Sequence, residues 1–310
     1  MSIFKQGKGG IRSKQLQEER ACYLMLATQI IGFIALSAYP IIWTFRWAFY
    51  NYNGVESKAV FVGLENFIRM FTTDFTYWKV WGNTLLLALC KLPLELPLAM
   101  IIALLLSQKK LFGSNFFRTM YYLPNIISVA VVGLIFSNMF SYWGYINTVL
   151  VNMGIIAEEI DWFSTKAGAM AVIVISSTWS SFGVNVMYFM AALTNVPEEL
   201  YECARLDGAS PWIVFWKITL PMIVSVFKII LLMSIVGTLG TNESILALTN
   251  GGPFGQTYTV MSYLTGKFVP GFADVANPNL GYGCAMSIIT TILFALIAVG
   301  YNWLNKKMQD

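Results

Sequence analysis

The sequence predicts an all-α integral membrane protein with six transmembrane helices. Of its 310 residues, 57% are hydrophobic and only 12% are charged, whereas soluble domains hold about half and about a quarter, respectively. The mean hydropathy is +0.63. Six apolar stretches reach the length of about 20 residues that a helix needs to cross a bilayer. They are residues 21–45, 80–106, 119–140, 167–193, 218–247 and 281–303.

The N-terminal segment, residues 1–20, is basic and precedes the first apolar stretch. No small-residue cleavage site follows that stretch, so we expect a first spanning helix and not a removable signal peptide. Residues 1–20 are therefore assigned to a cytoplasmic segment. Residues 21–310 are assigned to one six-helix transmembrane domain with a structured loop at 194–221.

The distribution of Lys and Arg predicts the orientation. Twelve of the 20 lie in residues 1–20, after the second and fourth apolar stretches, or at the C-terminus. Six lie in the intervening segments and two lie inside apolar stretches. Because positive residues concentrate on the cytoplasmic side, we expect both termini in the cytoplasm.

Several functions are excluded or disfavoured by composition. The chain has no His, which removes His-dependent catalysis and His-ligated metal sites. Its four Cys form no C-x-x-C pair, and the net charge of +4 is too small to indicate a nucleic-acid partner. No G-x-x-x-x-G-K-[ST] motif occurs, so the chain cannot bind ATP by that loop. We expect no enzyme, no metal and no cofactor bound by this chain.

The loop between the fourth and fifth apolar stretches carries the strongest local signals. It reads N-V-P-E-E-L-Y-E-C-A-R-L-D-G-A-S-P over residues 195–211. Pro197 suits the first position of a helix, and Gly208 suits its end because glycine adopts a positive φ without penalty. Ser210 and Pro211 then suit the N-cap and first residue of a second helix. The loop is predicted to be a rigid helix–turn–helix knob, suited to docking into a groove of another protein.

The spacing E-C-A-x3-G, nine residues, I-x-L-P in this loop resembles the cytoplasmic motif of binding-protein-dependent ABC importer permeases. Cys203 replaces the usual Ala of that motif. Y-L-P-N-I-I-S (122–128) and T-N-G-G-P (249–253) are similar to the maltose-type carbohydrate permeases, and resemble the first of two paired permeases. The matching loop residues are Glu202, Cys203, Ala204, Gly208, Ile218, Leu220 and Pro221.

The resemblance implies a type I permease bundle in which this loop is the coupling helix. The implied partners are a second homologous permease, two ATP-binding cassette subunits that hold ATP and magnesium, and an extracytoplasmic solute-binding protein. The implied location is the bacterial cytoplasmic membrane, in contact with lipid. The implied cargo is a sugar, oligosaccharide or similar polyol, and the chain itself performs no covalent chemistry.

Polar residues inside the fourth and fifth stretches indicate a pathway, since such residues usually face the bundle interior or water. Ser177 and Ser181 share one helical face, as do Ser234 and Thr238. The alternative is that these hydroxyls only bond their own backbone or a neighbouring helix. The resemblance implies sugar contacts at Ser177, Ser180, Ser181, Val184, Ser234, Thr238, Thr241 and Asn242.

Charged residues inside the apolar stretches support a rival hypothesis. In a self-sufficient secondary transporter or channel, the pair Lys91 and Glu95, or Glu243, would couple to protons or ions. The commoner role of such an i, i+4 pair is mutual neutralisation, and Glu243 is expected to reach the membrane interface. A phosphorylated cargo is disfavoured because phosphate needs a cation along the path, and the fourth and fifth stretches supply only Lys228.

Overall fold

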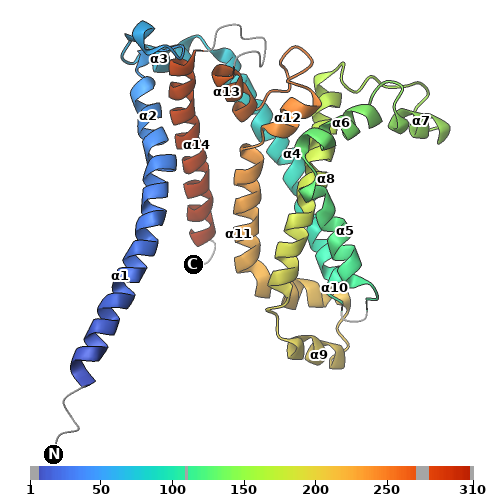
Figure 1. The fold of residues 1–310 in the computed structure, drawn as a ribbon. Helices are drawn as coiled ribbons and strands as arrows, with labels where there is room; N and C mark the ends of the chain where they lie inside the picture. The colour runs from blue at the N-terminus through green and yellow to red at the C-terminus, as the bar shows by residue number, and fades with distance from the viewer. Residues whose placement is uncertain (1–6, 109–110, 270–278, 308–310) are drawn as a thin grey trace, which may run out of the picture. The chain divides into compact units, whose positions relative to one another are not determined.

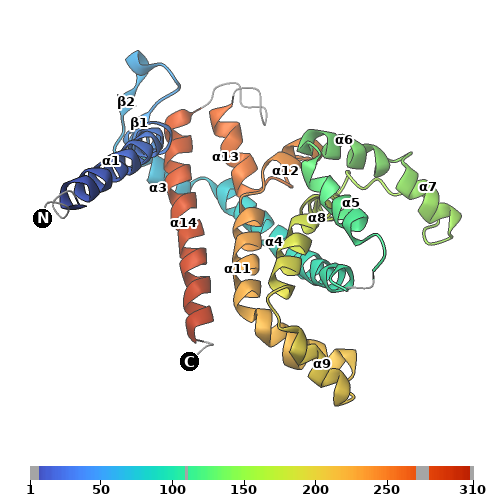
Figure 2. The same ribbon diagram turned by 60° about the horizontal axis from the view of Figure 1, so that its bottom comes forward.

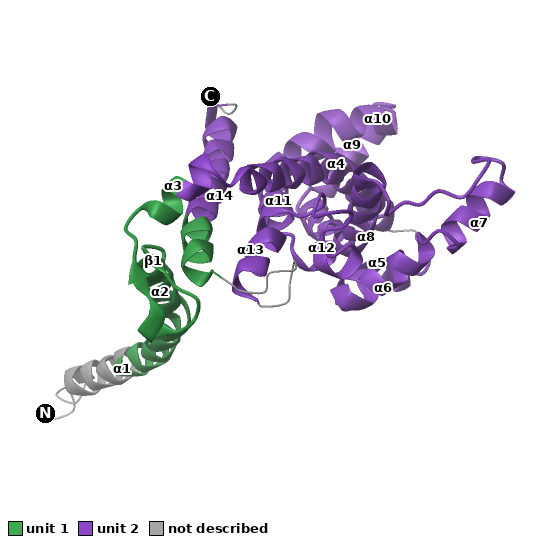
Figure 3. Cartoon of the chain, turned by 90° about the horizontal axis from the view of Figure 1, so that it is seen from above, with its two compact units in different colours: residues 1–68, 279–288 green, residues 69–278, 289–310 purple. Residues whose placement is uncertain are grey.

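The computed structural model describes residues 7–108, 111–269 and 279–307, and these are almost entirely helical (Figure 1). They divide into two compact units, which Figure 3 colours separately: residues 1–68 with 279–288, and residues 69–278 with 289–310. Among the described residues, five helical segments are long and apolar enough to cross a membrane, and a bent pair of helices makes a sixth candidate. The segments are Arg20–Trp47, Phe75–Leu106, Lys166–Leu193, Pro211–Leu239 and Leu280–Lys307, with the pair Ser114–Ile126 and Val129–Met139.

The first unit begins with one long helical segment. Its parts are α1 (Gly7–Phe33), a π turn (Ile34–Ala38) and α2 (Tyr39–Trp47). None of the residues in its most apolar 18-residue window is buried inside the chain. The apolar side chains of this helix are therefore not covered within the first unit.

A short two-stranded sheet follows α2 in the same unit. β1 (Tyr50–Asn51) pairs antiparallel with β2 (Val60–Phe61), with Tyr50 opposite Phe61, and a 3-10 turn (Glu56–Lys58) lies between them. In α3 (Glu65–Thr72), the Asn66 Nδ2 donates to the carbonyl oxygens of Ala48 and Tyr50, at 2.9 and 3.0 Å. The buried amide thus joins the start of α3 to the end of α2.

The second unit is built on three helices that lie side by side: α4 (Phe75–Leu106), α8 (Lys166–Leu193) and α11 (Leu220–Leu239) (Figures 1 and 2). Their shared core includes Leu96, Phe189 and Ile223, all buried. Phe189 also stacks on Phe227, with ring centroids 5.8 Å apart. Two prolines lie inside α4 without ending it, as membrane helices allow when neighbours satisfy the freed backbone groups.

The stretch 119–140, expected to be one helix, is divided in the structure. α5 (Ser114–Ile126) and α6 (Val129–Met139) meet at an angle of 94°. The backbone of Ile127 and Ser128 is extended between them. A Cβ on Gly133 would lie 2.6 Å from the Cβ of Ala247, so α6 packs tightly on α12 (Glu243–Leu248) and does not continue α5. Hydropathy detects the apolar run but not this contact.

The stretch 218–247 also differs from its expected bounds. The helix begins earlier, because Pro211–Val214 (α10), a π turn (Phe215–Thr219) and α11 follow one another without a break. It ends earlier, at Leu239, since Gly240 is the C-cap. Beyond that cap, the Thr241 carbonyl accepts a hydrogen bond from Thr259 Oγ1 at 2.8 Å. The contact with Thr259 holds the chain in a turn, and the apolar residues after it form α12.

Hydrogen bonds join the start of α13 (Val260–Phe268) to α4. Thr84 Oγ1 on α4 accepts the backbone N–H of Val260 at 2.9 Å, and Asn83 Nδ2 donates to the carbonyl of Tyr258 at 2.8 Å. These two contacts fix the start of α13 against α4. The other helices are α7 (Tyr145–Asn152), α9 (Glu198–Leu206) and α14 (Leu280–Lys307).

Candidate functional site

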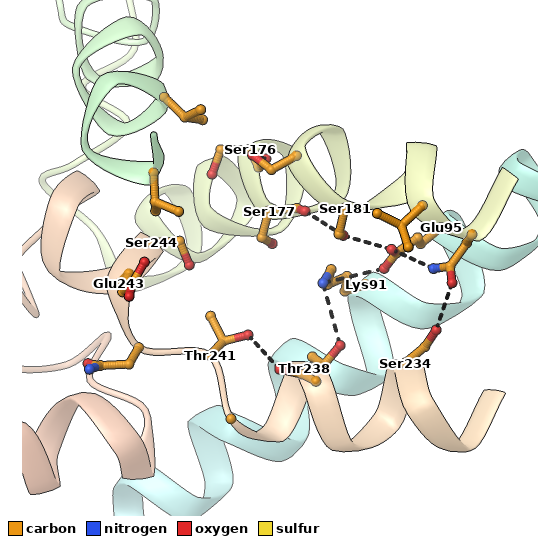
Figure 4. Close-up of a pocket in the computed structure, with 18 of the residues that line it drawn as sticks. Lys91, Glu95, Ser176, Ser177, Ser181, Ser234, Thr238, Thr241, Glu243 and Ser244 are labelled. Atoms are coloured by element: carbon orange, nitrogen blue, oxygen red, sulfur yellow. Dashed lines mark hydrogen bonds and ion pairs between the residues drawn. The ribbon is translucent and has the colours of Figure 1, made fainter. Parts of the chain in front are cut away.

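A cavity of about 660 Å³ lies within the second unit, lined by α4, α6, α8, α11, α12, the turn at residues 240–242 and Met261 of α13. Figure 4 shows side chains from several of these helices pointing into it. Its volume falls in the range of small-molecule sites. All eight residues predicted for the pathway line this one cavity: Ser177, Ser180, Ser181, Val184, Ser234, Thr238, Thr241 and Asn242.

The hydroxyls of Ser177 and Ser180 donate hydrogen bonds to backbone carbonyls of their own helix, α8. Ser177 Oγ donates to the Ile173 carbonyl at 2.6 Å, and Ser180 Oγ donates to the Ser176 carbonyl at 3.0 Å. Thr241 on the opposite wall does the same toward Gly237, at 3.3 Å. The alternative of backbone bonding thus describes these three residues, but it does not exclude ligand contact. Each hydroxyl oxygen still has lone pairs that can accept from a ligand.

A buried ion pair forms part of the wall. Lys91 Nζ lies 3.4 Å from Glu95 Oε2, as mutual neutralisation predicts. Glu95 Oε1 accepts from Ser181 Oγ at 2.7 Å and from Asn185 Nδ2 at 2.9 Å (Figure 4). Glu95 is only 1% exposed, so each of these bonds compensates for lost hydration of the carboxylate.

The same network reaches α11. Lys91 Nζ donates to Thr238 Oγ1 at 3.5 Å, and Ser234 Oγ donates to Asn185 Oδ1 at 3.3 Å. Charged and amide groups therefore connect α4, α8 and α11, the three helices that enclose most of the cavity. Asn185, four residues after Ser181 on the same helical face, also lines the cavity and was not among the eight predicted contacts.

Glu243 lines the cavity at an exposed position, and its expected location at the membrane interface stays a prediction. It is the first residue of α12, and Figure 4 shows it at the end of the cavity away from Ser234. The reason is the early end of α11 at Leu239, which turns the chain back over the cavity. Ser176, Tyr188 and Ser244 also line the cavity and were not among the eight predicted contacts.

The loop after α8 has the predicted helix–turn geometry. Gly208 has φ +69°, and the backbone N–H of Gly208 donates to the Arg205 carbonyl at 3.1 Å. The N–H of Ala209 donates to the Ala204 carbonyl at 2.9 Å. Together these bonds form a Schellman motif that closes α9. Pro197 is the N-cap of α9, so the helix begins one residue later than predicted.

The second helix of the loop is not separate from the fifth span. Ser210 caps it as predicted, accepting the Ile213 N–H at 3.4 Å. Ile218 then lies in the π turn, and Leu220 and Pro221 form the first turn of α11. Tyr201 Oη lies within hydrogen-bonding distance of Thr219 Oγ1, at 3.2 Å, and ties α9 to this helix. Of the remaining motif residues, Ala204 is buried while Glu202, Cys203 and Gly208 are exposed.

The position of this loop is clear in two views. Figures 1 and 2 show α9 at the end of α8 and α11 that lies away from α12 and α13. Residues 95–310 match the family described as binding-protein-dependent transport system inner membrane component. That match covers well over half of the sequence. The chain belongs to this family. It is a multi-pass membrane permease, and the family resemblance read from its motifs is confirmed.

Relatives of known name match along nearly the whole permease. The lactose transport system permease protein LacF of Rhizobium radiobacter is 31% identical, over 89% of this chain and 91% of its own. The multiple sugar-binding transport system permease protein MsmF of Streptococcus mutans is 30% identical, over 86% and 89%. Matches of this extent do not support the rival hypothesis of a self-sufficient transporter or channel.

Solved structures confirm the expected type I permease fold. A chain from a bacterial ABC transporter involved in the import of the acidic polysaccharide alginate superposes with a TM-score of 0.80. The match covers 96% of this permease and 99% of that chain, at 21% identity. A chain from a second structure, of the bacterial alginate ABC transporter in complex with an alginate pentasaccharide-bound periplasmic protein, also superposes with a TM-score of 0.80.

Proposed function

We propose that this permease imports a sugar, oligosaccharide or similar polyol as one subunit of an ATP-driven, binding-protein-dependent transporter. The observation that carries the proposal is the cavity, where hydroxyl and amide groups from α8 and α11 face one space. Hydroxyls and amides both donate and accept, which matches the groups of a sugar. Tyr188 adds an aromatic side chain for the apolar faces of a ring.

The loop around α9 is proposed to couple the permease to an ATPase subunit. Large apolar side chains are exposed there, with Leu206 at 88% and Trp212 at 70%. Exposed apolar groups on a rigid knob are typical of a docking surface. The coupling residues of the motif, from Glu202 to Pro221, lie on this knob or on the helix that follows it.

A movement of this knob would be transmitted to the cavity through one helix. The segment Pro211–Leu239 is one continuous helix, and it carries Ser234 and Thr238 in the cavity wall. Tyr201 ties α9 to the base of the same helix. A displacement of the knob by closing ATPase subunits would therefore move the cavity wall as a rigid element.

The remaining partners are proposed from the family. A second homologous permease would supply the other half of the pathway, and a solute-binding protein would deliver cargo from outside. Two ATP-binding cassette subunits would hold ATP and magnesium, since this sequence lacks the phosphate-binding motif. The Lys and Arg distribution supports the proposal that both termini lie in the cytoplasm.

A mild-detergent purification of this permease from its native membrane, followed by mass spectrometry, tests the assembly. We expect a P-loop ATPase and a second six-span permease to copurify. The purified complex is then reconstituted in proteoliposomes with its binding protein and assayed for ATP-dependent sugar uptake. Recovery of the permease alone, with transport activity that needs no ATP, would overturn the proposal.

A further inference from the structure

The cavity contains more negative than positive charge. Among the described residues that line it, the charged ones are Lys91, Glu95 and Glu243. The single ammonium group is held by the Glu95 carboxylate, and Lys91 is only 6% exposed. An acidic ligand would need an available cation, and here the cation is neutralised while Glu243 adds a second carboxylate.

Buried polar atoms without hydrogen-bond partners give an independent indication. Within the described part of the chain, Asn242 Oδ1 and Ser244 Oγ are buried without a hydrogen-bond partner, and Glu95 Oε2 has the Lys91 ammonium at 3.4 Å but no hydrogen bond of good geometry. All three belong to residues that line the cavity. The amide oxygen of Asn242 can only accept a hydrogen bond, whereas the hydroxyl of Ser244 can accept or donate. Since buried polar atoms normally have partners, Asn242 Oδ1 and Ser244 Oγ favour a ligand that donates hydrogen bonds, such as a hydroxylated sugar.

We infer that the cavity selects neutral sugars against acidic ones, and that Glu95 determines this specificity by neutralising Lys91. The inference rests on the proposed function and specifies the charge of the sugar that is imported. Glu95→Gln retains an oxygen that can accept from Ser181 and Asn185 but leaves the Lys91 charge unpaired. Lys91→Met has the opposite effect, because it leaves the two carboxylates without a cation.

The experiment measures the electrostatic environment of the cavity in the assembled importer. All four native Cys are replaced by Ser, and Ser180→Cys supplies one thiol in the cavity wall. Modification rates are compared for two methanethiosulfonates of similar size, one with a trimethylammonium group and one with a sulfonate. In this parent we expect the cationic reagent to react faster. Glu95→Gln should shift the rate ratio toward the sulfonate by roughly tenfold.

Two further variants keep the inference testable if Glu95→Gln does not fold. Lys91→Met should shift the ratio toward the cationic reagent, and Glu243→Gln should shift it toward the sulfonate. Glu56→Gln is the matched control, because Glu56 also pairs with a cation, Arg46, at 3.6 Å but on an exposed surface. It should leave the ratio unchanged.

The inference is overturned if the parent reacts faster with the sulfonate, or if the cavity variants shift the ratio in one common direction or not at all. Thiol modification needs no transport, so it remains measurable if the importer takes up no sugar. Failure of uptake would then count against the proposed function, and failure of the ratios would count against the charge selection.

Discussion

The cavity and the coupling loop depart from ordinary side-chain burial in opposite ways. In the cavity wall, charged and amide groups such as Lys91, Glu95 and Asn185 are buried. Around α9, the large apolar side chains of Leu206 and Trp212 are exposed. The cavity polar groups bond to one another across three helices, whereas these apolar groups of the loop face outward. The cavity groups thus have partners within the chain, whereas the exposed apolar groups of the loop are free for the docking proposed above.

This difference predicts which substitutions damage folding and which damage only transport. A change in the cavity network leaves a buried group without its compensation. A change in the loop alters a surface that the isolated chain does not cover. The two regions can therefore be separated by measuring stability and uptake on the same variants.

The largest effect is expected from Gly208→Asp, which should abolish uptake while leaving membrane insertion intact. Gly208 has φ +69°, a conformation that side chains rarely adopt, so Asp distorts the end of α9. Uptake and the amount of protein in the membrane fraction are measured together. Gly154→Asp is the control, since Gly154 has φ +68° and also has open space around it. Normal uptake by Gly208→Asp would contradict the coupling role.

Glu95→Leu should destabilise the protein by about 3 kcal/mol, because it leaves the buried Lys91 ammonium unpaired. Thermal unfolding in detergent measures the loss. The double variant Lys91→Met, Glu95→Leu should recover most of it. Glu56→Leu removes one partner of an exposed pair and should change stability little. An equal loss in both Leu variants would show that burial of the pair does not matter.

Gly133→Leu should destabilise the protein by about 2 kcal/mol, because the new side chain forces α6 away from Ala247. Gly82→Leu is the matched control on α4, where nothing lies within 4 Å of the added Cβ. Unfolding midpoints of the two variants are compared under identical conditions. A stable Gly133→Leu would argue against the close contact that bends the third span.

The smallest effect is expected from Ser234→Ala, which should raise the half-saturation concentration of sugar uptake about fivefold, as for one lost hydrogen bond. Proteoliposome uptake measures it. Thr28→Val is the control, because the Thr28 hydroxyl bonds to the Leu24 carbonyl at 3.2 Å on an exposed face of the first helix. Identical uptake curves for the two variants would argue against sugar contact at Ser234.

The eight candidate pathway residues were proposed from the family resemblance, and helical spacing showed in addition that some of them share a face. Ser177 and Ser181 are four residues apart, and so are Ser234 and Thr238. The position of Glu243 on the cavity wall was not predicted, because hydropathy continued the fifth span to residue 247 while the helix ends at Leu239. Apolar composition does not distinguish one long helix from two helices joined by a turn.

The sequence by itself determined the class of protein, the apolar segments and the turn at Gly208. Those features depend on composition and on bonds between residues a few positions apart. Only the tertiary structure decided the bend between α5 and α6 and the bonds of Glu95 to Ser181 and Asn185. The latter join residues 86 and 90 positions apart in the chain. Such contacts form only when separate helices pack, so no local pattern specifies them.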